Sequence, residues 1–253
     1  MAKENPLASN LTLEQQKNLF GNAYLNMLWH CPTDQRFPYW VHLPDCYYDE
    51  KDPHYKLLVI IHGTGCAVED YVRHAKELAD RDHVAVLAPL FPGGLIQRDD
   101  FNSYKLLSCD GVRYDQILLD MIDDMAKRYP GVETDKFFLF GHSGGGQFAN
   151  RFLFAHPEKL RACAIGAPGR PTFLNPDEDY FWGTRDFKNY FGHDVDLAAV
   201  QKVPVLVIVG ENDTKFIGDS PYGDNRVARM KSLQKNLQDH GVHTELTILP
   251  GFA

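Results

Sequence analysis

The sequence lacks any apolar run long enough to cross a membrane, because its apolar stretches fall short of the roughly 18 residues that such a helix needs. Residues 1–30 carry polar groups throughout and lack the uninterrupted apolar core of a secretory signal. We therefore expect a soluble, cytoplasmic protein that does not act at a membrane.

The sequence also lacks a concentration of basic residues. Its 26 Lys and Arg are outnumbered by 34 Asp and Glu, which gives a formal net charge of −8. Nucleic acids and anionic membranes bind concentrated positive faces. This balance argues against nucleic acid as a partner and favours a small-molecule substrate, and it does not fix an oligomeric state.

Cysteine is scarce and shows no metal-binding pattern. The five cysteines cannot all pair within the chain, and they show neither C-x-x-C spacing nor a histidine pattern suited to zinc. Free thiols are expected, with a Cys31–Cys46 disulfide as the alternative. We expect neither a metal nor an organic cofactor.

Length and composition predict one globular domain. The 253 residues are 44% hydrophobic and 24% charged, and no linker rich in Ser, Pro or Gly divides them. We take 1–253 as a single domain, with an N-terminal helical extension at 1–37 and a lid-like insertion at 169–201.

Apolar runs alternate with amphipathic segments along most of the chain. Strands are expected at 39–43, 57–61, 84–88, 137–140, 162–165, 203–209 and 244–249, and helices at 68–81, 112–128, 145–156 and 225–239. This order predicts an α/β fold, with a mostly parallel sheet covered by helices on both faces. An opening helix is also expected, with Thr12 and Gln15 at capping-box spacing and an apolar face that continues through Ala23 and Tyr24 to Met27 and Leu28.

The insertion at 169–201 departs from this alternation. Its aromatic residues follow no steady period, and they are Phe173, Tyr180, Phe181, Trp182, Phe187, Tyr190 and Phe191. Long insertions between strands are often lids or binding loops, so Phe181 and Trp182 are candidate substrate contacts. A small satellite core held by the aromatics is the alternative, and both interpretations stay open.

A G-x-S-x-G pattern, Gly141-His142-Ser143-Gly144-Gly145, directly follows the expected strand 137–140 and opens the next expected helix. At such a strand-to-helix turn the glycines remove side chains that would clash, and the serine stands at the carboxyl edge of the sheet. Ser143 is therefore the candidate nucleophile, and a serine that only caps a turn is the alternative. His142 is a candidate substrate contact, although packing of its side chain on a neighbouring strand is the preferred interpretation.

The loop His62-Gly63-Thr64-Gly65 directly follows the expected strand 57–61. A tetrahedral intermediate needs two preorganised donors, and the Thr64 and Gly144 N–H groups are the candidates for this oxyanion hole. Gly63 lets the backbone come close and is a candidate substrate contact. We expect the His62 imidazole to brace the loop. A simple turn is the alternative for the glycines.

The segment Gly210-Glu211-Asn212-Asp213 closes the expected strand 203–209. A carboxylate at this edge can orient an imidazole and stabilise its protonated form. Asp213 is the candidate acid and Glu211 the alternative, although an Asp after a strand is common in ordinary turns.

With these motifs the chain resembles the α/β-hydrolase superfamily over roughly 38–253. The motifs that carry the resemblance are H-G-T-G, G-H-S-G-G-G, G-E-N-D and the final L-P-G. It looks most like single-domain carboxylesterases and the polyhydroxyalkanoate-depolymerase or feruloyl-esterase group. The resemblance implies a Ser-His-Asp hydrolase of an ester, lactone or related acyl bond, with a small apolar or aromatic substrate. Cleavage of an amide or a carbon–carbon bond, or ligand binding without catalysis, remain alternatives.

The resemblance places the triad histidine after the final strand, where Pro250-Gly251-Phe252-Ala253 stands at the end of the printed sequence. We expect this histidine directly after Ala253, on the interpretation that the chain is truncated there. His193 in the insertion is the alternative. The other histidines considered are expected to lie away from Ser143, and they are His156, His240 and His243.

Overall fold

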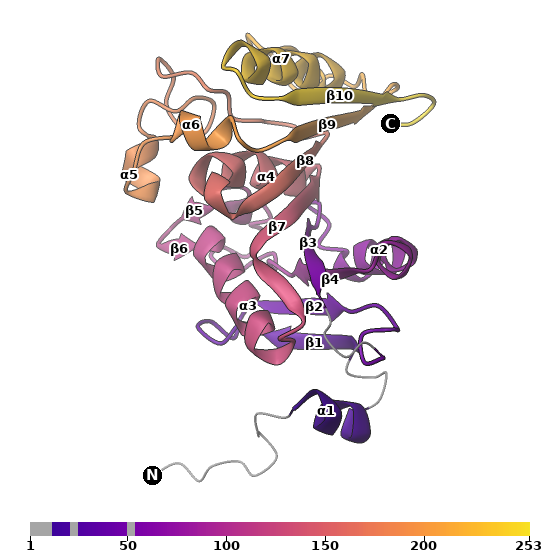
Figure 1. Ribbon diagram of the computed structural model, residues 1–253. Helices are drawn as coiled ribbons and strands as arrows, with labels where there is room; N and C mark the ends of the chain where they lie inside the picture. The colour runs from indigo at the N-terminus through magenta and orange to yellow at the C-terminus, as the bar shows by residue number, and fades with distance from the viewer. Residues whose placement is uncertain (1–11, 21–24, 50–53) are drawn as a thin grey trace.

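The computed structural model describes residues 12–20, 25–49 and 54–253 and contains an eight-stranded mixed sheet (Figure 1). Its strands are β1 (Asn26–His30), β2 (Pro38–His42), β3 (Tyr55–Ile61), β4 (Val84–Pro89), β7 (Val132–His142), β8 (Leu160–Gly166), β9 (Val205–Gly210) and β10 (Thr244–Leu249). Their order is β1-β2-β4-β3-β7-β8-β9-β10. The run from β4 to β10 is parallel, whereas β2 pairs antiparallel with β4 and β1 antiparallel with β2.

Helices fill most of the connections between these strands, as the sequence predicts. They are α1 (Leu13–Phe20), α2 (Val68–Asp82), α3 (Tyr114–Arg128), α4 (Gly144–Ala155), α5 (Phe187–Phe191), α6 (Leu197–Val200) and α7 (Arg226–Asp239). Two short 3-10 helices, η2 (Ser103–Leu106) and η3 (Pro157–Lys159), and a two-stranded ribbon of β5 (Ser108–Cys109) and β6 (Val112–Arg113) complete the described elements. The α/β class with helices on both faces is confirmed.

The two faces of the sheet follow from the alternation of side chains along each strand. In β3, Leu57 and Val59 join the large core that includes residues of α3 and α4, whereas Leu58 and Ile60 face α2. Figure 1 shows α2 on one side of the sheet and α3 and α4 on the other. Beside α2, an apolar hollow of about 670 Å³ lies between Tyr71 on the helix and Phe140 on the sheet.

The N-terminal region differs from its prediction. The capping box is present, because the Thr12 N–H donates to Gln15 Oε1 at 2.8 Å and the Gln15 N–H donates to Thr12 Oγ1 at 3.2 Å. The helix α1 nevertheless ends at Phe20, and Met27 and Leu28 lie in strand β1. The expected helical continuation through them is wrong because pairing with β2 gives this segment an extended partner. The predicted positions Ala23 and Tyr24 lie outside the described residues.

The aromatic residues of the insertion occupy two kinds of position. Phe173, Phe187 and Phe191 are buried and belong to the main core rather than to a separate satellite core. Phe181 is half-buried and lines a cavity described below. The five cysteines are free thiols, so the disulfide alternative is excluded. In the described part of the chain, no helix is long and apolar enough to cross a bilayer.

A buried ionic cluster fixes the helix that carries the candidate nucleophile. Asp115, at the start of α3, is fully buried and accepts hydrogen bonds from Arg113 Nε at 2.9 Å and Nη2 at 2.7 Å. Its Oδ2 also lies 2.7 Å from Nε2 of His156, the residue that ends α4. Burial alone would raise the pKa of Asp115, but the hydrogen bonds from His156 and Arg113 outweigh it and hold the pKa below its ordinary value.

We expect Asp115→Asn to lower the free energy of unfolding by about 3 kcal/mol, because it removes the buried carboxylate that pairs with Arg113 and bonds to His156. The measurement is urea denaturation at neutral pH. Asp123→Asn, an exposed position on the same helix, is the matched control and should change stability by less than about 0.5 kcal/mol. Equal effects of the two substitutions would show that the cluster contributes nothing specific.

Candidate active site

Three of the predicted motifs meet at one edge of the sheet. In the parallel register, Ile61 at the end of β3 pairs with Gly141 of β7, and His142 pairs with Gly166 at the end of β8. The loops that follow β3, β7 and β9 therefore leave the sheet at the same carboxyl edge, where open α/β sheets bind ligands.

Ser143 occupies a strained turn between β7 and α4. Its backbone has φ 55° and ψ −109°, a left-handed φ that non-glycine residues rarely adopt. The Ser143 N–H donates to the Gly166 carbonyl at 2.8 Å, and its own carbonyl accepts from Gln147 N–H at 3.2 Å. A Cβ at Gly145 would lie 2.8 Å from the His62 carbonyl oxygen, so only glycine lets the helix start this close to β3.

The two candidate oxyanion donors lie next to each other. A Cβ built on Gly144 would lie only 3.1 Å from the Thr64 nitrogen, and one built on Gly63 would lie 3.8 Å from Ser143 Cβ. Among the described residues, neither the Thr64 N–H nor the Gly144 N–H has a protein acceptor. Two unpaired N–H groups beside the serine can together receive a negatively charged oxygen.

His62 braces the loop, as predicted. Its Nδ1 lies 2.7 Å from the Gly63 carbonyl oxygen and its Nε2 accepts the Phe91 N–H at 3.0 Å, so both ring nitrogens are occupied. Burial lowers the pKa of His62 to about 4. The charge of Lys105 also lowers this pKa, and the hydrogen bond with Gly63 opposes both effects. The imidazole is therefore neutral at physiological pH and fixes the Gly63 carbonyl.

Asp213 is buried after β9 and pairs with an arginine. Arg226 Nη1, at the first residue of α7, donates to Asp213 Oδ1 at 3.0 Å. The charges of Asp213 and Arg226 both act on His142. Desolvation and the charge of Arg226 lower the pKa of His142, and the charge of Asp213 raises it. The alternative acid, Glu211, is exposed and accepts the Gly251 N–H at 3.1 Å.

No histidine in the described part of the chain contacts Ser143 or Asp213 through a hydrogen bond. His193 lies in the insertion with Nδ1 2.9 Å from the Asp194 carbonyl oxygen, and its ring lies beside Phe187. His156 belongs to the Asp115 cluster, and His240 bonds to the Asn236 carbonyl. The structure thus places none of these side chains as a base for Ser143.

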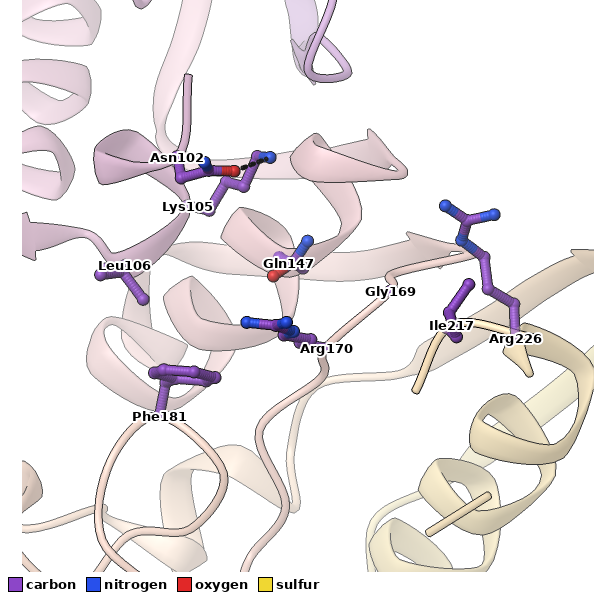
Figure 2. A pocket seen from close by; sticks show the side chains of 9 residues that line it. All are labelled: Asn102, Lys105, Leu106, Gln147, Gly169, Arg170, Phe181, Ile217 and Arg226. Atoms are coloured by element: carbon purple, nitrogen blue, oxygen red, sulfur yellow. Dashed lines mark hydrogen bonds between the residues drawn. The ribbon is translucent and has the colours of Figure 1, made fainter. Parts of the chain in front are cut away.

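A cavity of about 400 Å³ adjoins the turn (Figure 2). Two of its lining residues lie next to the turn. Gln147 is one helical turn along α4 from Ser143, and the Lys105 Cε would lie 2.8 Å from a Cβ built on Gly144. Its lining residues are Asn102, Lys105, Leu106, Gln147, Gly169, Arg170, Phe181, Ile217 and Arg226.

Of the four predicted substrate contacts, only Phe181 lines this cavity. Trp182 instead packs on Tyr222, with ring centroids 6.1 Å apart, and on the Arg229 guanidinium. Gly63 and His142 lie at the turn itself. In the register, His142 is opposite Gly166 of β8, which agrees with the preferred interpretation that its side chain packs on a neighbouring strand.

Sequence reasoning missed the basic residues of the site. Lys105, Arg170 and Arg226 stand far apart in the chain, so no local cluster announces them. It also missed Tyr104, whose hydroxyl donates to the His62 carbonyl at 3.1 Å. Among the residues that the structure describes, no three His, Cys, Asp or Glu side chains gather as a metal site.

Neither a protein-family model nor a curated protein sequence matches this chain, whereas solved structures do. Poly(aspartic acid) hydrolase-1 from Sphingomonas sp. KT-1 matches with a TM-score of 0.73 and 19% identity, over 90% of this chain and 92% of that one. A poly(3-hydroxybutyrate) depolymerase from Bordetella parapertussis matches with a TM-score of 0.72 and 19% identity, over 98% and 90%. An S-formylglutathione hydrolase from Agrobacterium tumefaciens matches with a TM-score of 0.59 and 15% identity, over 90% and 86%.

These likenesses, together with the strand order and the turn at Ser143, show that the chain has the α/β-hydrolase fold. The fold class predicted from the motifs is confirmed.

The neutral His62 makes stability depend on pH. Because its folded pKa of about 4 lies below the ordinary value of about 6.5, the unfolded state binds more protons between these values. The stabilisation is complete above about pH 6.5 and is lost as the pH falls toward 4. In urea titrations across this window, His62→Gln should flatten the slope of unfolding free energy against pH, by up to about 1.4 kcal/mol per pH unit.

The matched control for this titration is Asn189→Gln, at an exposed position of α5 that carries no titratable group. It should leave the slope unchanged. Slopes that are identical in wild type and His62→Gln would contradict the assignment.

Proposed function

We propose that this chain is a serine hydrolase that cleaves a carboxylic ester, lactone or related acyl bond of a small substrate through an acyl-enzyme. The observation that carries the proposal is the position of Ser143, at φ 55° and ψ −109° on a strand-to-helix turn, beside the unpaired Thr64 and Gly144 N–H groups. The structural neighbours support it, since they include a poly(3-hydroxybutyrate) depolymerase and a ferulic acid esterase.

In this mechanism the Ser143 hydroxyl attacks the substrate carbonyl, and the carbonyl oxygen becomes an oxyanion. The Thr64 and Gly144 N–H groups donate to that oxygen, and the positive end of the α4 dipole lies on the same side. The leaving group departs with a proton, and water then releases the acid from Ser143. The His62–Gly63 hydrogen bond keeps the loop, and with it the Thr64 donor, in position.

The serine needs a base, and the proposal places a histidine beside Asp213. The carboxylate binds Arg226 through Oδ1, so Oδ2 is available for an imidazole. The segment after β10 returns to this place, because the Asn212 N–H donates to the Phe252 carbonyl at 2.7 Å. A histidine placed directly after Ala253 would therefore start next to the loop that carries Asp213.

The apolar part of the substrate has a place in the adjoining cavity. Leu106, Phe181 and Ile217 contribute apolar surface to its lining, and a cavity of about 400 Å³ suits a small ligand. This supports the expected small substrate with an apolar portion.

We expect a fluorophosphonate probe to label Ser143 covalently and Ser143→Ala to abolish the labelling, as measured by intact-protein and peptide mass spectrometry. The probe phosphonylates an activated serine, with a P–O bond formed and fluoride released, and it does not need complete turnover. A protein that stays unlabelled even with a histidine added after Ala253, or that is labelled at another residue, would contradict the proposed nucleophile.

The base is tested in the same assay. Adding a histidine after Ala253 should accelerate labelling by about 100-fold or more, because loss of a triad histidine costs on the order of 10⁴ to 10⁶ in rate. Adding a glutamine there is the matched control and should not accelerate it. Equal rates for the two extensions would exclude this position for the base.

Gly144→Ala should slow labelling and ester hydrolysis by about 100-fold, the effect of losing one oxyanion donor. The new Cβ would meet the Tyr104 hydroxyl, the Lys105 side chain and the Thr64 nitrogen, so the donors must separate. Gly65→Ala, in the neighbouring loop, is the control, because a Cβ there meets nothing within 4 Å. Its rate should stay within about twofold of wild type, and a comparable loss in both variants would refute the steric argument.

A further inference from the structure

The cavity beside Ser143 is positively charged although the chain is negative. Lys105, Arg170 and Arg226 line it, and none of the other lining residues is acidic. The chain as a whole carries a formal charge of −8, so this is a local reversal of sign. Resting on the proposed hydrolase function, we propose that the cavity binds a carboxylate on the substrate, which makes the substrate class an ester with an anionic end.

Lys105 is a buried cation without an ion-pair partner among the described residues. Its Nζ donates to the neutral amide oxygen of Asn102 at 2.6 Å, and only 7% of the residue is exposed. Desolvation lowers its pKa, and the charge of Arg151 adds to this. The charge of Asp100 opposes these effects, and its Oδ1 already accepts the Asn102 and Ser103 N–H groups.

The two arginines also keep donors available. The Arg170 side chain is exposed and has no ion pair or hydrogen bond among the described residues. Arg226 uses Nη1 for Asp213, but its Nε is buried with no partner in the described part of the chain. Figure 2 shows Lys105 and Arg226 on different sides of Gln147, with Arg170 set off toward Phe181.

A third arginine, Arg151, holds the wall of the cavity from behind. It is fully buried and donates to the Lys105 carbonyl at 2.6 Å, the Arg170 carbonyl at 2.8 Å and Thr172 Oγ1 at 3.0 Å. Its partners are neutral oxygens, so its charge adds to that of the lining. By bonding both carbonyls it also fixes the two residues that face the ligand.

These features together select a carboxylate. Guanidinium groups match the two oxygens of a carboxylate in planar, charge-assisted hydrogen bonds. Binding one would also reduce the repulsion among cations held in a poorly solvated site. The apolar surfaces of Leu106, Phe181 and Ile217 would contact a short hydrocarbon chain between the carboxylate and the ester.

The test compares two isosteric esters, the anionic mono-4-nitrophenyl adipate and the neutral 4-nitrophenyl 6-methylheptanoate, by the rate of 4-nitrophenolate release. At low ionic strength the anionic ester should have kcat/KM about 10-fold higher or more, the effect of one charge-assisted hydrogen bond. The ratio should fall toward one in about 1 M salt, which screens the attraction.

Arg170→Gln should lower this ratio by about fivefold or more, and Arg170→Lys should lower it less, because lysine keeps the charge and loses only the planar pair of donors. Lys202→Gln is the matched control, since it removes one exposed positive charge at the end of α6 and should not change the ratio.

Release from both esters at a ratio near one, or a ratio insensitive to salt and to Arg170→Gln, would overturn this inference and leave the hydrolase proposal standing. If neither ester reacts and Ser143 resists the fluorophosphonate probe, the proposed function fails and the inference fails with it.

Discussion

The turn at Ser143 is the constraint on which the rest of the site depends. It holds a non-glycine residue at a left-handed φ, and this requires β7, β8 and the loop after β3 to support it from three sides. The Gly166 carbonyl accepts the serine N–H, and the glycine at 145 lets α4 begin against the end of β3. Strain of this kind persists only where packing over-determines it, and α4 is also anchored at its far end by the Asp115 cluster.

Electrostatics divides the site into two parts with different tasks. At the turn, the unpaired Thr64 and Gly144 N–H groups lie beside the serine and the His62 imidazole is neutral, so a negative charge arises there only during a reaction. In the cavity, the positive charges belong to side chains of the protein. Arg151 bonds the backbone carbonyls of Lys105 and Arg170, and Asn102 accepts a hydrogen bond from the Lys105 ammonium. The first part suits a transient oxyanion, and the second suits a stable charge that the substrate brings with it.

Much of this arrangement could be predicted from the sequence, because it depends on local patterns. Apolar runs buried on both faces identify the parallel strands, and the glycine patterns at Gly63 and Gly144 identify the loops that follow two of them. Strand β1 could not be found this way, since Met27 and Leu28 also fit a helical spacing and only pairing with β2 decides. The cationic lining was missed for a related reason, because Lys105, Arg170 and Arg226 meet only in the tertiary structure.

The bonds from Arg151 to two separate loops tie opposite stretches of the cavity wall into one mechanical unit. The binding site is therefore preformed, and ligand binding requires little rearrangement of the backbone. Encounter is then governed by diffusion and by the attraction between opposite charges, which is felt from a distance of several ångströms and weakens in concentrated electrolyte. The same hydrogen bonds keep the backbones of Lys105 and Arg170 at a fixed separation, so the spacing of the two charges is set before the ligand binds.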